Sequence, residues 1–345
     1  MTISGDLDLS QLPTGDWLSG LLRVRPVVLD TSPLTCDVIS VARTRGGMPS
    51  PLLVALRIGV LRGYAASHVW AEVPRVLARR AGRARIPVEV LEAIWWNEYV
   101  PLVKFVDCTG LPTTDQATNL TRRDPSDANT LVLAGLIAPV VVIAEDRDIV
   151  ASGLAYEQWR DFYNVAETIT TGRSYLTGAT GLVVLAGHGL VGAGRMAARA
   201  ARNPWIVAAA ALCTLLLGRY ANGWVPQLRT TWREGVTGRR EYGEALARML
   251  VIAASRVRRA EATWNDAERG EAGAPLLHRL ARVLAVADAP MTRTELMHEL
   301  GQPARRATMA ALADLLSHHP AFHEATRGRW QLGRDRMDFG GFSLP

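Results

Sequence analysis

The chain has 345 residues, of which 48% are apolar and 21% are charged. These fractions are typical of globular proteins and exclude wholesale disorder, and the length predicts two or three domains. The formal net charge of +6 fits a polyanion or an anionic lipid surface as partner. Lys104 is the only lysine, however, and an arginine-rich composition also follows from a GC-biased genome, so the charge alone is weak evidence.

The cysteines and the N-terminus indicate a reducing location. Cys36, Cys108 and Cys213 are widely spaced and include no C-x-x-C pair, which argues against a disulfide framework and against a thiolate zinc site. The N-terminal residues carry acids where a signal peptide would have a basic region and an apolar core. We therefore expect a cytoplasmic protein.

Between residues 26 and 164, short apolar runs alternate with helical patterns. The candidate strands cover residues 27–30, 102–108 and 139–146, and the helical patterns cover residues 55–80 and 124–138. In the first of these helical patterns we expect Pro74 to interrupt the helix. Short strands that alternate with helices predict an α/β fold with a parallel sheet flanked by helices.

A strongly apolar stretch follows at residues 174–218. Residues 174–194 are long enough to span a membrane but contain His188 and six glycines, whereas residues 204–218 are apolar but short. Two interpretations stay open. One is a membrane hairpin that anchors the protein to the inner face of the cell membrane, although its connecting arginines would face outward, against the positive-inside tendency. The other is a helical pair of a soluble protein, packed on the other domains.

The last 70 or so residues have a pattern of their own. Residues 276–287 form an amphipathic helical pattern, and Thr292 and Glu295 have capping-box spacing at the start of a second helix that Gly301 closes. A third helical pattern stops at Pro320, and two short strands are predicted around the next turn. Three helices followed by a β-ribbon predict a winged helix-turn-helix.

Four arginines of this region suit contacts with phosphates, and they are Arg305 and Arg306 at the start of the third helix and Arg327 and Arg329 in the wing. The same fold also serves to dock proteins or to form homodimers, so DNA and a protein are both open as its partner.

These patterns give a linear division of the chain. It comprises a polar lead-in (1–26), an α/β domain (27–165), a Gly/Ala-rich apolar helical hairpin (166–225), a charged helical linker (226–273), a winged-helix domain (274–333) and a tail (334–345).

Acidic residues fall at the predicted carboxyl ends of the strands. Asp30 ends the first strand, and Asp146 and Asp148 follow the third, so these carboxylates are expected at one edge of the sheet. Asp127 lies at a helix start, and Glu72 lies on the helix that faces this edge. Convergent acids repel one another unless divalent cations lie between them, and ligands that are all oxygens indicate Mg²⁺ or Mn²⁺.

In these segments the chain resembles the PIN-domain nucleases. The resemblance rests on VVLDTSPL around Asp30, SHVWAEVPRVL with Glu72, RRDPSDANTLVLAGLIA with Asp127 and VVVIAEDRDI with Asp146, and it covers roughly the first 160 residues. It implies a PIN-like domain in which these four acids bind Mg²⁺ or Mn²⁺ and activate water to hydrolyse single-stranded RNA. Many members of the family are toxins, which implies an antitoxin as partner.

Some assignments within the resemblance have competitors. The alternatives to Glu72 are Glu89, Glu92 and Glu98, and the alternative to Asp127 is Asp124. We expect Asp124 and Asp148 to support the metal ligands, and Thr31 or Ser32 to orient one of them. The family often has Thr or Ser two residues before its last acid, where this chain has Ala144, and the segment between Asp30 and Asp127 is longer than in a compact toxin.

Two functions follow from these observations. The first is a metal-dependent endoribonuclease whose winged helix delivers it to nucleic acid or to a protein partner. The alternative is a catalytically inactive PIN-like binding module within a DNA-binding regulator, either membrane-tethered or soluble.

Overall fold

The computed structural model describes residues 23–44, 49–111, 125–155, 162–172, 255–270, 272, 275–301 and 306–335. The apolar stretch at 174–218, Asp124 and Arg305 lie outside these residues, so what was inferred about them stays a prediction. Within the described ranges, no helix is long and apolar enough to cross a membrane.

The chain divides into two compact units. One combines Met1–Trp17 with Thr171–Val257, and the other combines Leu18–Thr170 with Arg258–Pro345. Nearly all described residues belong to the second unit, so the fold presented below is that of this unit. It takes in both the predicted α/β region and the C-terminal region.

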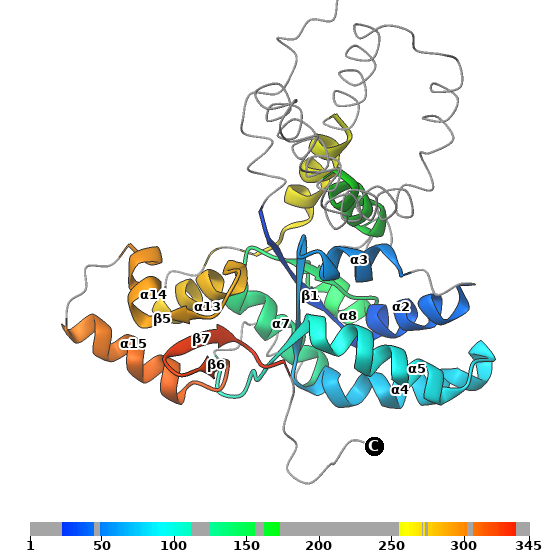
Figure 1. The fold of residues 1–345 in the computed structure, drawn as a ribbon, viewed down its shortest axis with the longest axis horizontal. Helices are drawn as coiled ribbons and strands as arrows, with labels where there is room; N and C mark the ends of the chain where they lie inside the picture. Colours follow the sequence, from blue (N-terminus) through cyan, green and yellow to red (C-terminus); the bar gives the residue numbers. More distant parts are fainter. Residues whose placement is uncertain are drawn as a thin grey trace, which may run out of the picture. The chain divides into compact units, whose positions relative to one another are not determined.

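A parallel four-stranded sheet forms the centre of this unit (Figure 1). Its strands are β1 (Arg25–Leu29), β2 (Leu61–Ala66), β3 (Val103–Val106) and β4 (Val141–Ile143), in the spatial order β3-β2-β1-β4. Every residue of β1 and β4 is buried, as expected for a sheet with both faces covered. The predicted α/β fold with a parallel sheet flanked by helices is confirmed.

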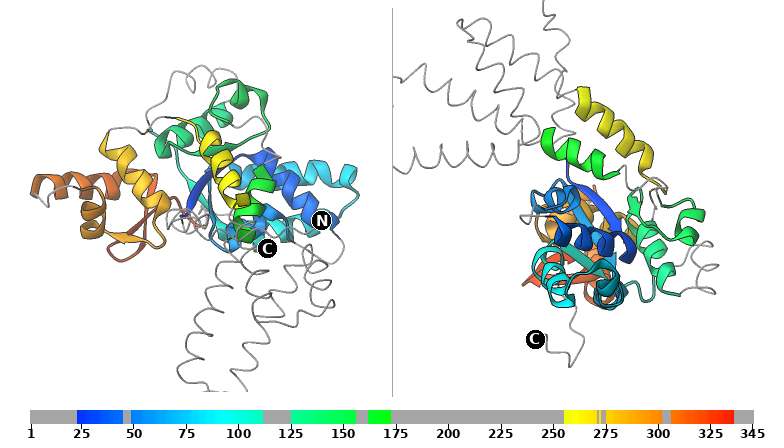
Figure 2. Two further views of the ribbon diagram at one scale, coloured as in Figure 1. Left: turned by 90° about the horizontal axis from the view of Figure 1, so that it is seen from above. Right: turned by 90° about the vertical axis from the view of Figure 1, so that its right-hand side faces the viewer.

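Helices cover both faces of the sheet. They are α2 (Thr31–Arg43), α3 (Pro51–Arg57), α4 (His68–Ala84), α5 (Val88–Ile94), the π-helix η2 (Trp95–Tyr99), the 3₁₀ turn η3 (Val100–Leu102), α7 (Pro125–Ile137) and α8 (Arg147–Ala151). The connections that contain α2 and α4 step outward from β1 to β3, whereas the connection that contains α7 crosses back to β4. Right-handed crossovers therefore place α7 on the opposite face from α2 and α4, as Figure 2 shows.

The single helix predicted over residues 55–80 is wrong, because this segment contains a strand. Helix α3 ends at Arg57, Gly59 turns the chain with a φ of +68°, and β2 follows. Strand β2 lies between β1 and β3, where space is tight: a Cβ on Gly63 would lie 3.0 Å from Leu29 Cδ1. Small residues therefore suit this central strand, although they obscure the alternation typical of strands.

The helix break predicted at Pro74 is also wrong. Helix α4 continues through Pro74 to Ala84. The proline costs the helix one backbone hydrogen bond, but α4 buries an apolar face on both sides of it, including Trp70 and Leu77. Tertiary packing of this kind supplies most of the stability of a helix in a protein.

The C-terminal region adds three helices and a small antiparallel sheet. The elements are α13 (Leu276–Val286), β5 (Met291–Thr292), α14 (Arg293–Glu299), α15 (Arg306–His318), β6 (Phe322–Thr326) and β7 (Arg329–Leu332), with the strands in the order β5-β7-β6. The predicted capping box is present, since Thr292 Oγ1 accepts from the Glu295 N–H and the Glu295 carboxylate accepts from the Thr292 N–H.

This region packs directly against the parallel sheet and shares one hydrophobic core with it. Helix α13 contacts α7, and the Tyr64 hydroxyl donates to Ala285 O at 3.2 Å. Beyond β7, the Arg334 and Phe105 backbones exchange two hydrogen bonds of 2.8 and 2.9 Å, which extends the pairing to β3. The C-terminal elements therefore belong to the same folded body as the sheet.

Two further helical stretches of this unit, residues 162–170 and 258–267, lie side by side in Figures 1 and 2. The rings of Phe162 and Trp264 pack with their centroids 4.5 Å apart. Arg25, buried at the start of β1, forms an ion pair of 2.9 Å with Glu261. These contacts attach both stretches to the sheet.

Candidate functional site

Asp30 stands where β1 ends and α2 begins. It is the N-cap of α2, and its carboxylate accepts a hydrogen bond of 3.4 Å from the Ser32 N–H. The side chain is only 3% exposed. The junction of a buried strand with a helix start thus holds this carboxylate at the carboxyl edge of the sheet, next to the partly positive N-terminus of α2.

Glu72 approaches the same place from the first two turns of α4. Its Oε2 accepts a hydrogen bond of 2.8 Å from the Thr31 hydroxyl, the residue that follows Asp30. His68 lies one turn earlier on α4, with its Nε2 3.7 Å from the same Oε2. The Glu72 side chain is 31% exposed, so this carboxylate is held on two sides while remaining open to solvent.

Asp146 follows β4, the neighbour of β1, and is the N-cap of α8. Its Oδ1 accepts a hydrogen bond of 2.7 Å from the Asp148 N–H. The side chain of Asp148 is exposed, and its backbone orients Asp146. Asp30 and Asp146 therefore have similar positions: each follows a strand, directly for Asp30 and three residues after Ile143 for Asp146, and each caps the next helix.

The charges of Glu72 and Asp146 affect the pKa of Asp30. The pKa of Asp30 is raised to about 6, mainly by burial and in smaller part by the negative charges of Glu72 and Asp146, although hydrogen bonds from the Thr31 and Ser32 N–H groups lower it. We name Asp30, Glu72 and Asp146 the acid cluster.

The acid cluster suits a hard divalent cation by its chemistry. Its donors are all carboxylate oxygens, which Mg²⁺ and Mn²⁺ prefer, and a cation would relieve the repulsion that now acts on Asp30. As the side chains stand, no three His, Cys, Asp or Glu residues in the described part of the chain are arranged closely enough to hold a metal ion. Binding would therefore require the partly exposed Glu72 and Asp146 to turn toward Asp30.

The fourth predicted ligand has a less definite position. Asp127 lies in the first turn of α7 and is half-buried. The charges of Glu72 and Asp146 act on Asp30. The assignment of Asp127 as a metal ligand stays a prediction.

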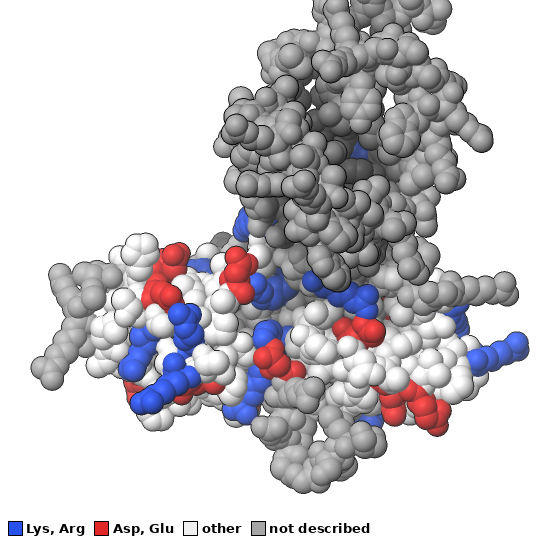
Figure 3. All heavy atoms as spheres, in the orientation of Figure 1, with Lys and Arg blue, Asp and Glu red and all other residues white. Residues whose placement is uncertain are grey.

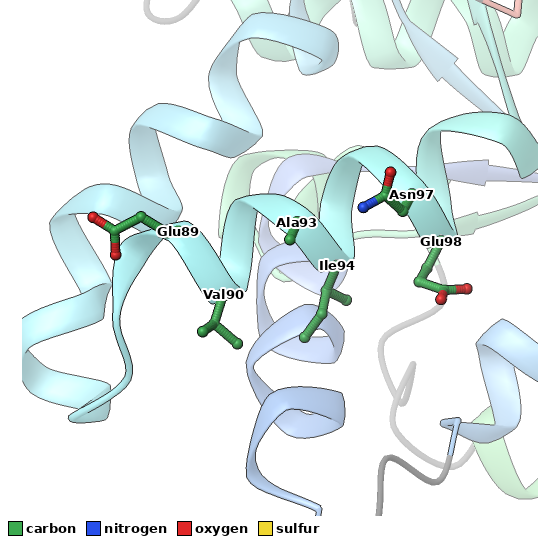
Figure 4. A pocket seen from close by; sticks show the side chains of 6 residues that line it. All are labelled: Glu89, Val90, Ala93, Ile94, Asn97 and Glu98. Atoms are coloured by element: carbon green, nitrogen blue, oxygen red, sulfur yellow. The ribbon is translucent and has the colours of Figure 1, made fainter. Parts of the chain in front are cut away.

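The glutamates considered as substitutes for Glu72 lie elsewhere. Glu89 and Glu98 line a shallow hollow on the outer face of α5 and η2, together with Val90, Ala93, Ile94 and Asn97 (Figure 4). Glu98 also pairs with Arg57. Glu92 lies on α5 as well, whereas Glu72 on α4 contacts Thr31, the residue that follows Asp30.

The arginines predicted to contact phosphates have different surroundings. Arg327 is exposed in the turn between β6 and β7. Arg329 is exposed too, but its guanidinium donates to Pro290 O at 2.9 Å and lies 3.6 Å from Glu295. Arg306 is the first residue of α15. Figure 3 shows Lys and Arg side chains gathered over the small C-terminal sheet, which gives this surface a positive character.

Two features near the acid cluster escape sequence reasoning. The His68–Glu72 pair has the i,i+4 spacing of helix partners, and this spacing would reveal it once the helix is known to begin at His68. The contact of Arg80 Nη1 with Cys36 Sγ, at 3.3 Å, joins α4 to α2 and has no local sequence signal.

The comparisons with known proteins add no relative: no family model, no curated protein and no solved structure matches this chain.

Proposed function

We propose that the protein is a metal-dependent endoribonuclease of PIN type that cleaves single-stranded RNA. The observation that carries the proposal is the acid cluster, in which Asp30 and Asp146 each follow a strand and cap a helix at the edge of a parallel sheet, and the charges of Glu72 and Asp146 act on the buried Asp30. Ligands of α/β sheets bind at this edge. The resemblance of the surrounding segments to PIN-domain nucleases supports the same conclusion.

Each acid has a distinct task in this proposal. Asp30 supplies the buried ligand at the base of the site, and Glu72 and Asp146 supply ligands from its rim. The Thr31 hydroxyl fixes one oxygen of Glu72, and the Asp148 N–H fixes one oxygen of Asp146. Mg²⁺ or Mn²⁺ bound there would neutralise the charge that develops on a phosphodiester during attack by water.

The C-terminal region supports a role in nucleic-acid handling. Its order of helices and strands is typical of a winged helix-turn-helix, and exposed arginines lie on its small sheet. Because it shares a core with the parallel sheet, it would present nucleic acid to the acid cluster from a constant position.

One observation favours the alternative function, a binding module without catalysis. The acids of the described residues do not form a set of three that could hold a metal ion as they stand. An acid cluster that fails to bind Mn²⁺ at millimolar concentration would leave nucleic-acid binding through the C-terminal region as the main activity.

The experiment that tests the proposal is a cleavage assay on the full chain with mixed single-stranded RNA and Mn²⁺. The test variant is the double substitution Asp30→Asn, Asp146→Asn. The matched control is Asp107→Asn, because Asp107 also follows a strand and accepts a backbone hydrogen bond, of 2.9 Å from Thr109, but does not act on Asp30.

We expect the wild type and Asp107→Asn to cleave RNA, and we expect both EDTA and the double substitution to abolish cleavage. If neither the wild type nor the double variant cleaves RNA or DNA, the nuclease function is refuted and the binding module is favoured. Cleavage that persists in the double variant would place the activity outside the acid cluster.

A further inference from the structure

A row of arginines extends from the acid cluster along the outer face of α4. Arg75, Arg79 and Arg83 follow Glu72 at intervals of three or four residues, which places all four on one side of a helix. Arg79 lies two turns beyond Glu72 and within about 20° of it around the helix axis. We name Arg75, Arg79 and Arg83 the α4 arginine row.

The row faces away from the protein. The opposite side of α4 is buried through Val69, Trp70, Val73, Val76, Leu77 and Ala81, whereas all three arginines of the row are exposed. No ion pair between described residues uses any of their guanidinium groups. Arg75 Nε donates to Ala71 O at 3.1 Å within the same helix, and its two terminal nitrogens remain available for a ligand.

The stability of α4 does not explain the row. Like charges four residues apart destabilise a helix by about 0.2–0.5 kcal/mol per pair, and the row contains two such pairs. Arg83, in the last turn, is favoured by the negative end of the helix dipole, but Arg75 lies too far from that end to benefit. An anionic partner bound along the row would relieve this repulsion.

The spacing of the row fits the backbone of a nucleic acid strand. Four residues of helix advance by about 6 Å, a distance on the scale of one nucleotide in an extended strand. Arg80 anchors α4 to Cys36 of α2, and Thr31 of α2 holds Glu72, so the row keeps a constant direction relative to the acid cluster. Positive tracks that follow the backbone are the general means of binding single strands.

We propose that the α4 arginine row binds the phosphates of the single-stranded RNA on one side of the cleavage point and leads the strand into the acid cluster. This inference rests on the proposed function, because it names the path of that site's substrate. The contacts would be to phosphates, so the row would add affinity without reading the base sequence.

The test measures binding of the full chain to a short fluorescein-labelled single-stranded RNA by anisotropy, in EDTA and over a series of salt concentrations. The test variant is the double substitution Arg75→Gln, Arg79→Gln. The matched control is Arg258→Gln, Arg259→Gln, which removes two exposed arginines of another helix. A third variant, Arg75→Lys, Arg79→Lys, keeps the charge and shows whether charge alone accounts for the effect.

We expect the test variant to lose at least about tenfold in affinity at low salt, and the slope of log K against log salt to fall by about 1.4, because each phosphate contact to a single strand contributes about 0.7. The lysine variant and the control should stay close to the wild type. Wild-type affinity and slope in the test variant would overturn the inference, as would an equal loss in the control.

Cleavage in Mn²⁺ separates this inference from the proposed function. If the test variant loses RNA binding and no protein cleaves RNA, the α4 arginine row binds RNA but the protein is not a nuclease. The opposite result is cleavage that depends on Asp30, together with a test variant that binds and cleaves RNA as the wild type does. This result would support the nuclease function and refute RNA binding by the α4 arginine row. If both are right, the test variant has a raised KM and an unchanged kcat at saturating RNA.

Discussion

Helix α2 and its N-cap carry two buried aspartates, seven residues apart, with opposite surroundings. Asp37 Oδ2 accepts hydrogen bonds of 2.6 Å from the Ser50 hydroxyl and 2.6 Å from the Tyr99 hydroxyl, inside the core. Asp30 receives backbone N–H groups and faces the charges of Glu72 and Asp146. The first carboxylate is satisfied by neutral donors, and the second is opposed by like charges.

This contrast shows that burial alone does not identify a functional acid. Burial raises the pKa of Asp37 as it does that of Asp30, and the hydrogen bonds from the Ser50 and Tyr99 hydroxyls offset part of this rise. Asp37 joins α2 to the start of α3 and to η2, which is a structural role. Asp30 lies in an arrangement that is unfavourable for the folded protein unless a cation or a proton is bound.

The largest effect is expected from Asp37→Ala. The substitution leaves the buried hydroxyls of Ser50 and Tyr99 without their acceptor, and we expect the free energy of unfolding to fall by about 4 kcal/mol. Urea unfolding measures this loss, while the folded fraction should bind Mn²⁺ as the wild type does. A loss below about 1 kcal/mol would mean that Asp37 is not the structural member of the pair.

Asp30→Asn should have the opposite effect on stability at neutral pH. Because the pKa of Asp30 is about 6 in the folded protein, against an ordinary value of 3.8, the folded protein binds a proton more tightly than the unfolded chain. The wild type is therefore destabilised as the pH rises from about 4 to about 6, by about 3 kcal/mol from this group. The asparagine variant lacks this contribution and remains a good N-cap.

The prediction is that the variant is more stable than the wild type at pH 8, and that the difference shrinks toward pH 4. Urea unfolding of both proteins at pH 4, 6 and 8 measures it. If the difference in free energy of unfolding between the two proteins is the same at pH 4, 6 and 8, the raised pKa of Asp30 is contradicted.

Mn²⁺ should offset the destabilisation that the ionised Asp30 causes in the wild type at neutral pH. At a hundredfold excess over its dissociation constant, a ligand that binds only the folded state adds about 2.7 kcal/mol. We expect this gain at pH 8 and a smaller one at pH 5, where a proton competes for Asp30. Thermal unfolding with and without MnCl₂ measures the gain, and Asp37→Asn, which keeps an acceptor for both hydroxyls, is the matched control that should retain it.

The smallest effect is expected from Thr31→Val. The substitution keeps the shape of the side chain and removes the hydroxyl that holds Glu72 at 2.8 Å. A hydrogen bond to a charged group contributes about 1.5–3 kcal/mol, but Glu72 is partly exposed and water can replace the donor, so we expect about 1 kcal/mol, or roughly a fivefold weaker Mn²⁺ affinity. Ser32→Ala, which removes a hydroxyl two residues after Asp30, should leave the affinity unchanged.

The sequence predicts the parallel sheet and its flanking helices, but it misses one strand of that sheet. Asp30 and Asp146 are predicted at one edge of the sheet because each comes at the end of an apolar run typical of a buried strand, directly for Asp30 and after Glu145 for Asp146, and parallel strands end at the same edge. Strand β2 is missed because Gly63 and the alanines beside it are selected by the tight packing between β1 and β3. That constraint comes from residues distant in sequence, so local propensity cannot reveal it.

The partners of Asp37 could not be predicted for the same reason. Ser50 and Tyr99 lie 13 and 62 residues from Asp37 along the chain, and only the packing of α2, α3 and η2 brings them together. The α4 arginine row is a different case, because its spacing is visible in the sequence. Its meaning depends on knowing that α4 continues past Pro74 and that Glu72 at its start reaches Asp30.

The most direct test of the central claim is a calorimetric titration of the full chain with Mn²⁺ at pH 7.5. We expect the wild type to bind Mn²⁺, Asp30→Asn to abolish this binding, and Asp107→Asn and Asp37→Asn to leave it unchanged. No binding to the wild type, or equal binding to Asp30→Asn, would contradict the claim that Asp30, Glu72 and Asp146 form a cation site.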